Sequence, residues 1–135
     1  RRTAITQATT GDEGGRRQLE DEKWYHGIRT RDDIAPLLRD SGDFLVRASE
    51  EGNVYTLVLN VKNGNEIDNL TLSLLDGRFV LHYLLNDKSN KAIFDSVSHL
   101  IRYYRRHRLP NGIRLVHGVN RPPWLLRHSA ISYDP

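Results

Sequence analysis

The order of hydrophobic and polar positions along the chain predicts a mixed fold. Between residues 44 and 81, apolar residues occur in short runs or alternate with polar ones, as they do in β-strands. Two other stretches, 30–38 and 96–107, place apolar residues three and four positions apart, as on one face of an amphipathic helix. The order helix, strands, helix predicts the α+β class: a central antiparallel sheet flanked by one helix on each face.

The first predicted helix begins at Thr30, whose side chain can cap a first turn that contains two acidic residues. Pro36 removes one backbone hydrogen bond and is expected to kink this helix. Gly42 can end it. The second predicted helix is capped by Asp95 or Ser96. Its apolar stripe consists of Val97, Leu100, Ile101 and Tyr104.

Two turn signals divide the central region into strands. Asn63-Gly64 and Asp76-Gly77 are dipeptides typical of tight β-hairpins. The strands that they separate are predicted at 44–46, 54–61, 70–75 and 78–81.

The length of 135 residues predicts one domain with flanking segments. Residues 1–22 are polar and rich in Gly and Thr, which is typical of a flexible segment. The first large apolar pair, Trp24-Tyr25, places the start of the domain at residue 23. Residues 120–135, with Pro122-Pro123, are interpreted as a linker. The predicted organisation is therefore a flexible segment at 1–22, a domain at 23–119 and a linker at 120–135.

The composition and the motifs of the chain exclude several classes of enzyme. The chain has no cysteine, so it can form no disulfide and use no cysteine nucleophile. It contains no P-loop and no Gly-rich nucleotide loop, so no kinase activity is expected in this stretch. The six histidines show no metal-ligand spacing. We expect a non-catalytic, cytoplasmic binding domain that is monomeric and needs neither cofactor nor metal.

Arg47 is the residue that fits a structural role least well. It directly follows Phe44-Leu45-Val46, an unbroken apolar run that predicts a strand covered on both faces. A charge at the end of a covered strand is costly unless an opposite charge meets it. Two hypotheses follow: an internal carboxylate pairs with Arg47, with Asp43 or Glu51 as candidates, or a ligand supplies the anion.

Neighbouring residues favour a ligand. Ser49 and Glu50-Glu51-Gly52 are predicted to form a polar turn that offers a hydroxyl and successive backbone N–H groups, as in an anion nest. Arg31 lies in the first turn of the first helix, which could bring it toward Arg47. Two guanidiniums with a hydroxyl suit a phosphoryl dianion. A deep pocket would select phosphotyrosine over the shorter phosphoserine by reach.

At these residues the sequence resembles a known family. The segments Trp24-Tyr25-His26-Gly27 and Gly42-Asp43-Phe44-Leu45-Val46-Arg47-Ala48-Ser49 resemble the signature of Src-homology-2 (SH2) domains, and the similarity extends over about 23–119. Within the family, the sequence is most similar to the Fes/Fer type of cytoplasmic tyrosine kinase. Trp124-Leu125-Leu126-Arg127-His128 with Ile131 resembles the junction between the SH2 and kinase domains in that type.

The resemblance implies a role for each matching residue. Arg47 would be the bidentate phosphate ligand, and Arg31 would contact the phosphate and the phosphotyrosine ring. Ser49 and the backbone of Glu50 would complete the phosphate loop, and Thr56 would line the pocket wall.

Two positions depart from the family pattern. The family often has a His followed two positions later by Lys or Arg on the fourth strand, where this chain has Asn69 and Thr71. Asn69 and Thr71 remain possible contacts of the phosphotyrosine ring. Because the histidine ring and one cation are absent, more of the binding would depend on Arg31 and Arg47.

A second, apolar pocket is implied for the residues that follow the phosphotyrosine. Leu70, Leu81 and Tyr104 stand at the positions that line this pocket in the family; alternatively, these three belong simply to the core. The segment 86–94 has no Trp, which argues against the turn-forming mode of peptide recognition.

The predicted partner is thus a tyrosine-phosphorylated peptide or protein. The predicted parent protein, of which this domain would be the recognition module, is a cytoplasmic tyrosine kinase. Two alternatives remain open. The net charge of +3 and the run Arg105-Arg106-His107-Arg108 also suit a module for anionic lipid or nucleic acid. Nucleic acid is not expected, because no aromatic-rich RNA-binding strand motif is present. The missing His and Lys also allow a degenerate SH2 domain. The sequence identifies neither the physiological partner nor whether Tyr133 is phosphorylated.

Overall fold

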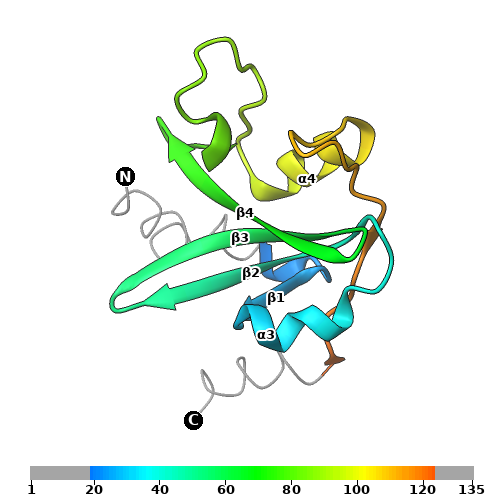
Figure 1. Ribbon diagram of the computed structural model, residues 1–135. Helices are drawn as coiled ribbons and strands as arrows, with labels where there is room; N and C mark the ends of the chain where they lie inside the picture. The colour runs from blue at the N-terminus through cyan, green and yellow to red at the C-terminus, as the bar shows by residue number, and fades with distance from the viewer. Residues whose placement is uncertain (1–18, 124–135) are drawn as a thin grey trace.

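The computed structural model describes residues 19–123 (Figure 1). It contains the predicted order of helix, strands and helix, with one further strand before the first helix and one after the second. The strands are β1 (Tyr25–Ile28), β2 (Asp43–Glu51), β3 (Val54–Asn63), β4 (Glu66–Leu75), β5 (Arg78–Leu81) and β6 (His117–Gly118). The helices are α3 (Arg31–Ile34), which continues as a 3₁₀ turn (Ala35–Leu37), a second 3₁₀ turn (His82–Leu84) and α4 (Val97–Arg106).

The sheet is antiparallel from β2 to β5, as predicted, and has a parallel addition that the sequence analysis did not predict. β2, β3, β4 and β5 lie side by side in chain order. β1 and the short β6 both pair with β2 in the parallel direction. Both predicted tight turns are present. In the β4–β5 turn, Asp76 and Gly77 have φ values of 53° and 81°, the two positive angles that a type I′ hairpin turn requires.

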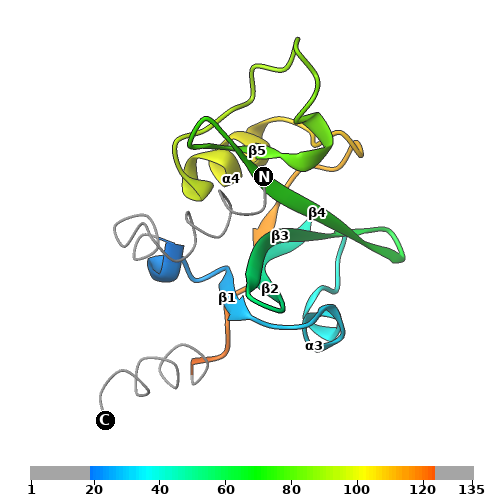
Figure 2. The ribbon, with the colours of Figure 1, turned by 90° about the vertical axis from the view of Figure 1, so that its left-hand side faces the viewer.

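The two helices lie on opposite faces of the sheet (Figures 1 and 2). α3 is shorter than predicted: its Thr30 cap accepts a hydrogen bond from the Asp33 N–H at 3.1 Å, but the α-helix ends before Pro36, which has no N–H to continue it. α4 has the predicted extent and begins at Ser96, whose Oγ accepts from the His99 N–H at 3.1 Å. Across residues 19–123, no helix has the length and apolar character needed to cross a membrane.

Each face of the sheet has its own hydrophobic core. On the α3 side, Ile34 and Leu38 pack against Leu45 of β2. The larger cluster on the α4 side includes Phe44 and Val46 from the same strand. β2 is buried on both faces along most of its length, as its apolar run predicted.

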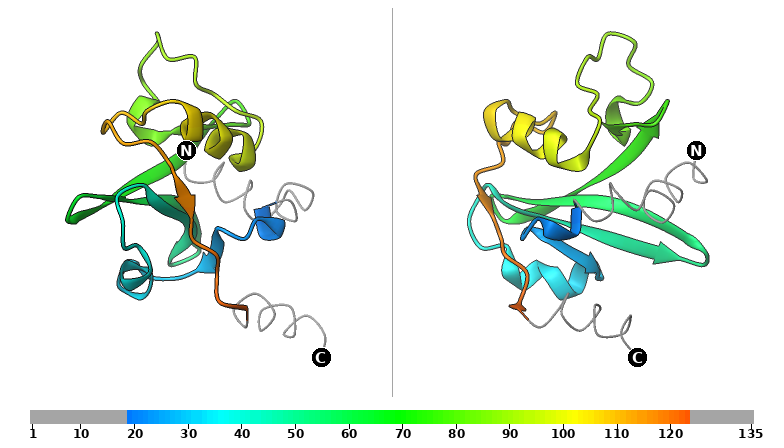
Figure 3. Two further views of the ribbon diagram at one scale, coloured as in Figure 1. Left: turned by 90° about the vertical axis from the view of Figure 1, so that its right-hand side faces the viewer. Right: turned by 180° about the vertical axis from the view of Figure 1, so that it is seen from behind.

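The folded region extends beyond the predicted domain boundaries at both ends. Leu19, which the prediction assigned to the flexible segment, is only 7% exposed and joins the α4-side core. Arg121, assigned to the linker, donates from its backbone N–H to Lys23 O at 2.8 Å and from Nη1 to Glu22 O at 2.6 Å. These contacts place 19–22 and 121 within the fold. Figure 3 shows the segment after α4 passing the sheet toward the side that carries α3.

A fully buried histidine should make the fold sensitive to acid. His26 Nε2 lies 2.8 Å from Val119 O and donates to it, while Nδ1 has no hydrogen-bond partner among the described residues. Burial lowers the pKa of His26 below its ordinary 6.5, and the nearby charges of Arg29 and Arg121 lower it further.

Below about pH 6.5, the unfolded chain therefore binds a proton that the folded chain does not. The contribution of neutral His26 to stability is therefore complete above about pH 6.5. Below that pH, the free energy of unfolding is expected to fall by about 1.4 kcal/mol for each pH unit, until the pKa of His26 in the folded state is reached. Denaturant titrations between pH 7.5 and 5.5 measure the slope. The variant His26→Gln should lose this part of the slope. Equal slopes in the two proteins would contradict the assignment.

Candidate functional site

The alternation of side chains along β2 sends Arg47 to the face that α3 covers. Successive residues of a strand point to opposite faces, so Arg47 shares a face with Leu45 and Ser49. Leu45 packs in the α3-side core, whereas Phe44 and Val46 pack on the α4 side. One strand thus builds both cores and carries a cation beside the smaller one.

Arg47 is only 7% exposed, and its described hydrogen bonds go to uncharged acceptors. Nε donates to Asn60 Oδ1 at 2.7 Å and Nη1 donates to Arg29 O at 3.1 Å. Nη2 lies 3.5 Å from Asn69 Oδ1. Within residues 19–123, no carboxylate comes within ion-pair distance of this guanidinium. Its positive charge is held in place without being neutralised.

Neither predicted internal partner of Arg47 forms the ion pair. Asp43 is buried, but one of its carboxylate oxygens accepts from the backbone N–H groups of Arg39 and Asp40, each at 3.1 Å. Glu51 is exposed at the far end of β2. The hypothesis of an internal carboxylate is wrong for both residues.

A second arginine adds to the positive potential at this point. Arg31 stands at the first position of α3, and its Nη2 donates to Ile67 O of β4 at 3.2 Å. Burial lowers the pKa of Arg47, and the charge of Arg31 lowers it further. Arginine remains protonated in proteins, so this shift describes a cation that is poorly solvated and close to a like charge. A bound anion would relieve both effects.

Polar side chains surround Arg47 on the same face of the sheet. Across the strands, Arg47 is opposite Val58, which in turn is opposite Thr71. Two residue pairs closer to the β2–β3 turn, and on the same face, Ser49 is opposite Thr56. The register therefore places Ser49, Thr56, Asn69 and Thr71 around Arg47, with Arg31 reaching in from α3. This set contains most of the residues that the sequence analysis selected for phosphate and ring contacts.

The predicted polar turn after Arg47 is in fact a regular hairpin. Ser49, Glu50 and Glu51 belong to β2 and pair with Thr56, Tyr55 and Val54, so the turn itself begins at Gly52. These β-branched and aromatic partners favour a longer strand. Glu50 Oε2 also accepts from the Tyr55 hydroxyl at 3.1 Å. The polar turn expected at 49–52 is thus replaced by paired strand as far as Glu51. The Val46 N–H and the Ala48 C=O bond to Trp24 O and the Arg29 N–H, so the alternation along β2 directs the Glu50 N–H away from β3 as well.

The three residues predicted to contact the peptide lie toward the opposite face of the sheet. Leu81 and Tyr104 are almost fully buried and belong to the α4-side core. Burial raises the pKa of Tyr104 to about 12. Leu70 is only partly buried and packs at the border of this core with other partly exposed residues, among them Phe79, Phe94 and Tyr103. Of the three, only Leu70 is partly accessible, and Leu81 and Tyr104 are core residues.

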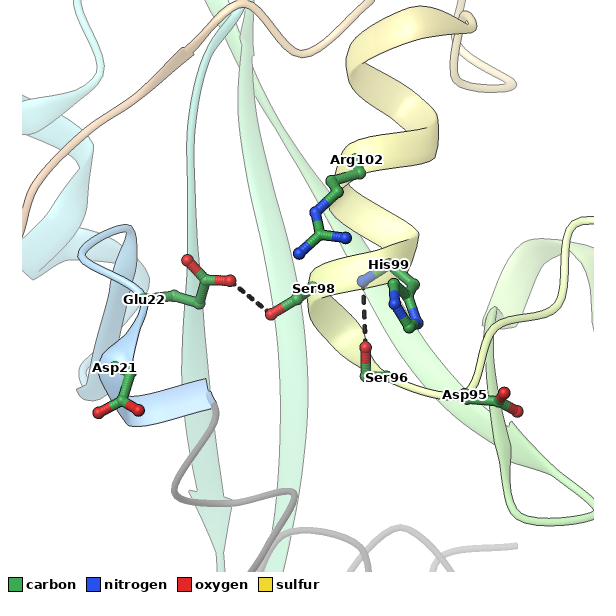
Figure 4. Close-up of a pocket in the computed structure, with 7 residues that line it drawn as sticks. All are labelled: Asp21, Glu22, Asp95, Ser96, Ser98, His99 and Arg102. Atoms are coloured by element: carbon green, nitrogen blue, oxygen red, sulfur yellow. Dashed lines mark hydrogen bonds between the residues drawn. The ribbon is translucent and has the colours of Figure 1, made fainter.

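A separate hollow of about 540 Å³ lies between residues 21–22 and the start of α4 (Figure 4). Two hydrogen bonds join residues that line it. Ser98 Oγ donates to Glu22 Oε2 at 2.6 Å, and Ser96 Oγ is used by the helix cap. Arg102 faces this hollow together with acidic residues, so the hollow has none of the uncompensated positive charge found at Arg47.

Two contributors to the Arg47 site were not predicted from the sequence. Arg29 provides its carbonyl oxygen, a backbone contact that side-chain patterns do not reveal. Asn60 lies in the predicted strand 54–61 and is fully buried, but no role in the site was predicted for it. An amide within an otherwise apolar run was the available signal, because a buried amide needs hydrogen-bond partners. Tyr133 and the segment similar to a kinase junction, 124–131, lie outside the described residues.

The chain is similar in sequence to several known proteins. The SH2 domain family model matches residues 24–104. Mouse suppressor of cytokine signaling 2 is 37% identical over 90 residues, which cover 65% of this chain and 45% of that protein. The Fps transforming tyrosine kinase of Fujinami sarcoma virus is 31% identical over 110 residues (82% of this chain, 12% of that protein). Fer-related kinase 1 of Caenorhabditis elegans is 26% identical over 141 residues (94% and 33%).

Solved structures with the same fold are also SH2 domains. The VAV1 SH2 domain, solved with a tyrosine-phosphorylated peptide from SLP76, superposes with a TM-score of 0.61 at 20% identity, covering 77% of this chain and 75% of that one. The present chain spans less than half the length of the curated relatives described above. From the family match over residues 24–104, the chain belongs to the SH2 domain family, a group of non-catalytic modules that bind phosphotyrosine.

Proposed function

We propose that this domain binds tyrosine-phosphorylated peptides, with Arg47 as the principal phosphate ligand. The observation that carries the proposal is a buried guanidinium held by neutral acceptors, with no carboxylate of residues 19–123 beside it. Folding places this charge in a poorly solvated position without an anion to pair with it. A phosphate ester carries about −1.5 to −2 charges at neutral pH and matches the donor geometry of arginine.

Arg31 would provide the second cation and could also pack against the phosphotyrosine ring. Ser49 and Thr56 would donate hydroxyl hydrogen bonds, and Asn69 and Thr71 would border the ring. Because Arg47 lies deep on the sheet, a long aromatic phosphate ester reaches it and a phosphoserine falls short. This difference in reach supports selectivity for phosphotyrosine.

The apolar residues after the phosphotyrosine would cross the sheet toward Leu70. An aliphatic residue at this border favours hydrophobic side chains in the peptide, since their burial adds affinity in proportion to the apolar area covered. Leu81 and Tyr104 would form the base of that second pocket.

For the parent protein we propose a cytoplasmic tyrosine kinase. Support comes from the extent of the matches: the Fps and Fer-related kinases align over 82% and 94% of this chain, against 65% for suppressor of cytokine signaling 2. The kinase matches thus reach further into the flanking segments. In such a protein, the domain would bring the catalytic region to phosphorylated partners.

Titration of the domain with matched ligands tests the binding proposal. The ligands are a phosphotyrosine peptide with aliphatic residues after the phosphotyrosine, its unphosphorylated and phosphoserine twins, an oligonucleotide and vesicles containing anionic lipid. We expect the phosphotyrosine peptide to bind at least about 100-fold more tightly than either twin, since charge-assisted contacts of this kind contribute about 2–5 kcal/mol. Equal affinity for the phosphorylated and plain peptides would refute the proposal, and preferential binding of oligonucleotide or vesicles would favour a general anion-binding module.

A further inference from the structure

Asn60 is a buried polar residue for which the proposed phosphate contacts do not account. It lies on β3, opposite Leu45 of β2 and Asn69 of β4, and is fully buried. An asparagine has two donor hydrogens and one acceptor oxygen to satisfy, and leaving them unsatisfied in the interior is costly. Its neighbours along the strand, Leu59 and Val61, are apolar, so the amide is an exception that calls for a specific role.

Every polar group of Asn60 is used, and its partners are parts of the site. Its Oδ1 accepts from Arg47 Nε at 2.7 Å. Its Nδ2 donates to Asp68 O at 3.2 Å and to Asn69 Oδ1 in a short hydrogen bond. Asn69 Oδ1 in turn lies 3.5 Å from Arg47 Nη2. Asn60 therefore joins Arg47 of β2 to β4 across the sheet.

The hydrogen bond at Nε fixes the orientation of the Arg47 guanidinium. This group is planar, so holding Nε and giving Nη1 to Arg29 O determines the direction in which Nη2 points. A guanidinium whose orientation is already fixed loses less rotational freedom on binding a phosphate than a mobile one. Asn60 can hold Arg47 in this way because its pair with Leu45 is two residue pairs from the Arg47–Val58 pair, which puts both side chains on the same face of the sheet.

The neutral amide matters as much as the hydrogen bond. An aspartate at position 60 could accept the same bond from Nε, but its charge would neutralise Arg47 before any ligand arrived. An amide accepts the bond and leaves the positive charge for the ligand. We propose that Asn60 is a positioning residue for phosphotyrosine binding, holding Arg47 through Nε while keeping its charge available; this inference rests on the proposed function.

Two substitutions separate this role from simple packing. Asn60→Leu removes the hydrogen bond but keeps the charge of Arg47, and we expect about a tenfold loss of affinity for a phosphotyrosine peptide. Asn60→Asp keeps an acceptor for Nε but adds a carboxylate, and we expect a loss of about 100-fold. For stability the order should be reversed. Both variants lose the Nδ2 donor to Asp68 O, but aspartate forms a new ion pair with Arg47, whereas leucine leaves Arg47 Nε without its acceptor. The variant that is more stable should therefore be the weaker binder.

The control for added negative charge is Asn65→Asp, in the exposed turn between β3 and β4, which should leave the affinity within about twofold of wild type. The Arg47 Nε–H resonance in ¹H–¹⁵N NMR spectra gives a readout independent of binding. It should be protected from exchange in the wild type, shift in Asn60→Asp, and broaden or exchange rapidly in Asn60→Leu.

The outcomes distinguish this inference from the proposed function. If the wild type does not prefer the phosphotyrosine peptide, the proposed function fails and this inference fails with it. If the wild type binds and folded Asn60→Asp binds as tightly as Asn65→Asp, the inference alone is overturned. Affinity that simply follows stability across the variants would also overturn it, since that is the behaviour of a residue with only a packing role. If Asn60→Leu fails to fold, the affinities of Asn60→Asp and Asn65→Asp for the phosphotyrosine peptide still decide whether Asn60 positions Arg47.

Discussion

Replacing Arg47 with methionine is expected to lower the affinity for a phosphotyrosine peptide by at least about 100-fold while leaving the domain folded. The guanidinium is the deepest cation of the site, and losing one partner of a buried charge pair costs about 2–5 kcal/mol of binding free energy. Isothermal titration calorimetry with the phosphorylated peptide measures the loss. Arg47→Lys should recover only a small part of the affinity, since an ammonium keeps the charge but not the parallel donors.

The free energy of unfolding of Arg47→Met should fall by about 1–3 kcal/mol, because Asn60 Oδ1 and Arg29 O lose their donor. The loss is limited because no carboxylate of residues 19–123 pairs with Arg47 and because the repulsion from Arg31 is relieved. Arg106→Met, at the exposed end of α4, is the matched control and should change neither affinity nor stability appreciably. A wild-type affinity in folded Arg47→Met would remove the basis of the proposed function.

Substituting alanine for Gly42 is expected to lower the free energy of unfolding by about 2–4 kcal/mol. Gly42 has a φ of +95°, which residues with a side chain rarely adopt and which costs about 1–3 kcal/mol. A Cβ at this position would also lie 2.7 Å from Val116 Cγ2 and 2.9 Å from Val116 Cβ. The Val116 side chain is 61% exposed and can rotate, but its Cβ is fixed because the Val116 N–H donates to Gly42 O at 3.0 Å.

Gly52→Ala is the control that isolates the close contact. Gly52 also has a positive φ, +64°, but an added Cβ there would meet nothing within 4 Å. We expect Gly52→Ala to cost about 1 kcal/mol, much less than Gly42→Ala. Thermal or urea unfolding gives both values. Equal costs at the two glycines would show that the contact with Val116 relaxes freely.

Local chemistry made most of the fold predictable. Ser96 and Thr30 act as helix caps because their hydroxyls accept from N–H groups that the first turn leaves free, an effect contained within four residues. Asp76-Gly77 forms its turn for an equally local reason. The parallel pairing of β6 with β2 was not predictable in this way, since His117–Gly118 is too short to show a pattern and is held by partners more than seventy residues away.

In the site, too, the features set by local sequence were predictable and those set by long-range contacts were not. Arg47 could be identified because a charge after an apolar run is anomalous on its own. The hydrogen bonds from Arg47 to Asn60 and to Arg29 O depend on strand register and on where β1 ends, which the sequence pattern leaves open. The length of β2 beyond Arg47 was underestimated, because a run of polar residues such as Glu50 is typical of a turn. The pairing of Glu50 with Tyr55 across the hairpin, which extends the strand, is not visible in the local pattern.

The attachment of Arg121 beside the start of β1 has a mechanical consequence. Its backbone N–H donates to Lys23 O, and its Nη1 donates to Glu22 O at 2.6 Å and lies 3.4 Å from Tyr25 O, so the chain enters and leaves the folded region at nearly the same point. A pulling force applied through both flanks would load these few contacts before it reached the ladder between β2 and β3. The domain should thus yield first by peeling at this junction, while the surface around Arg47 is still intact.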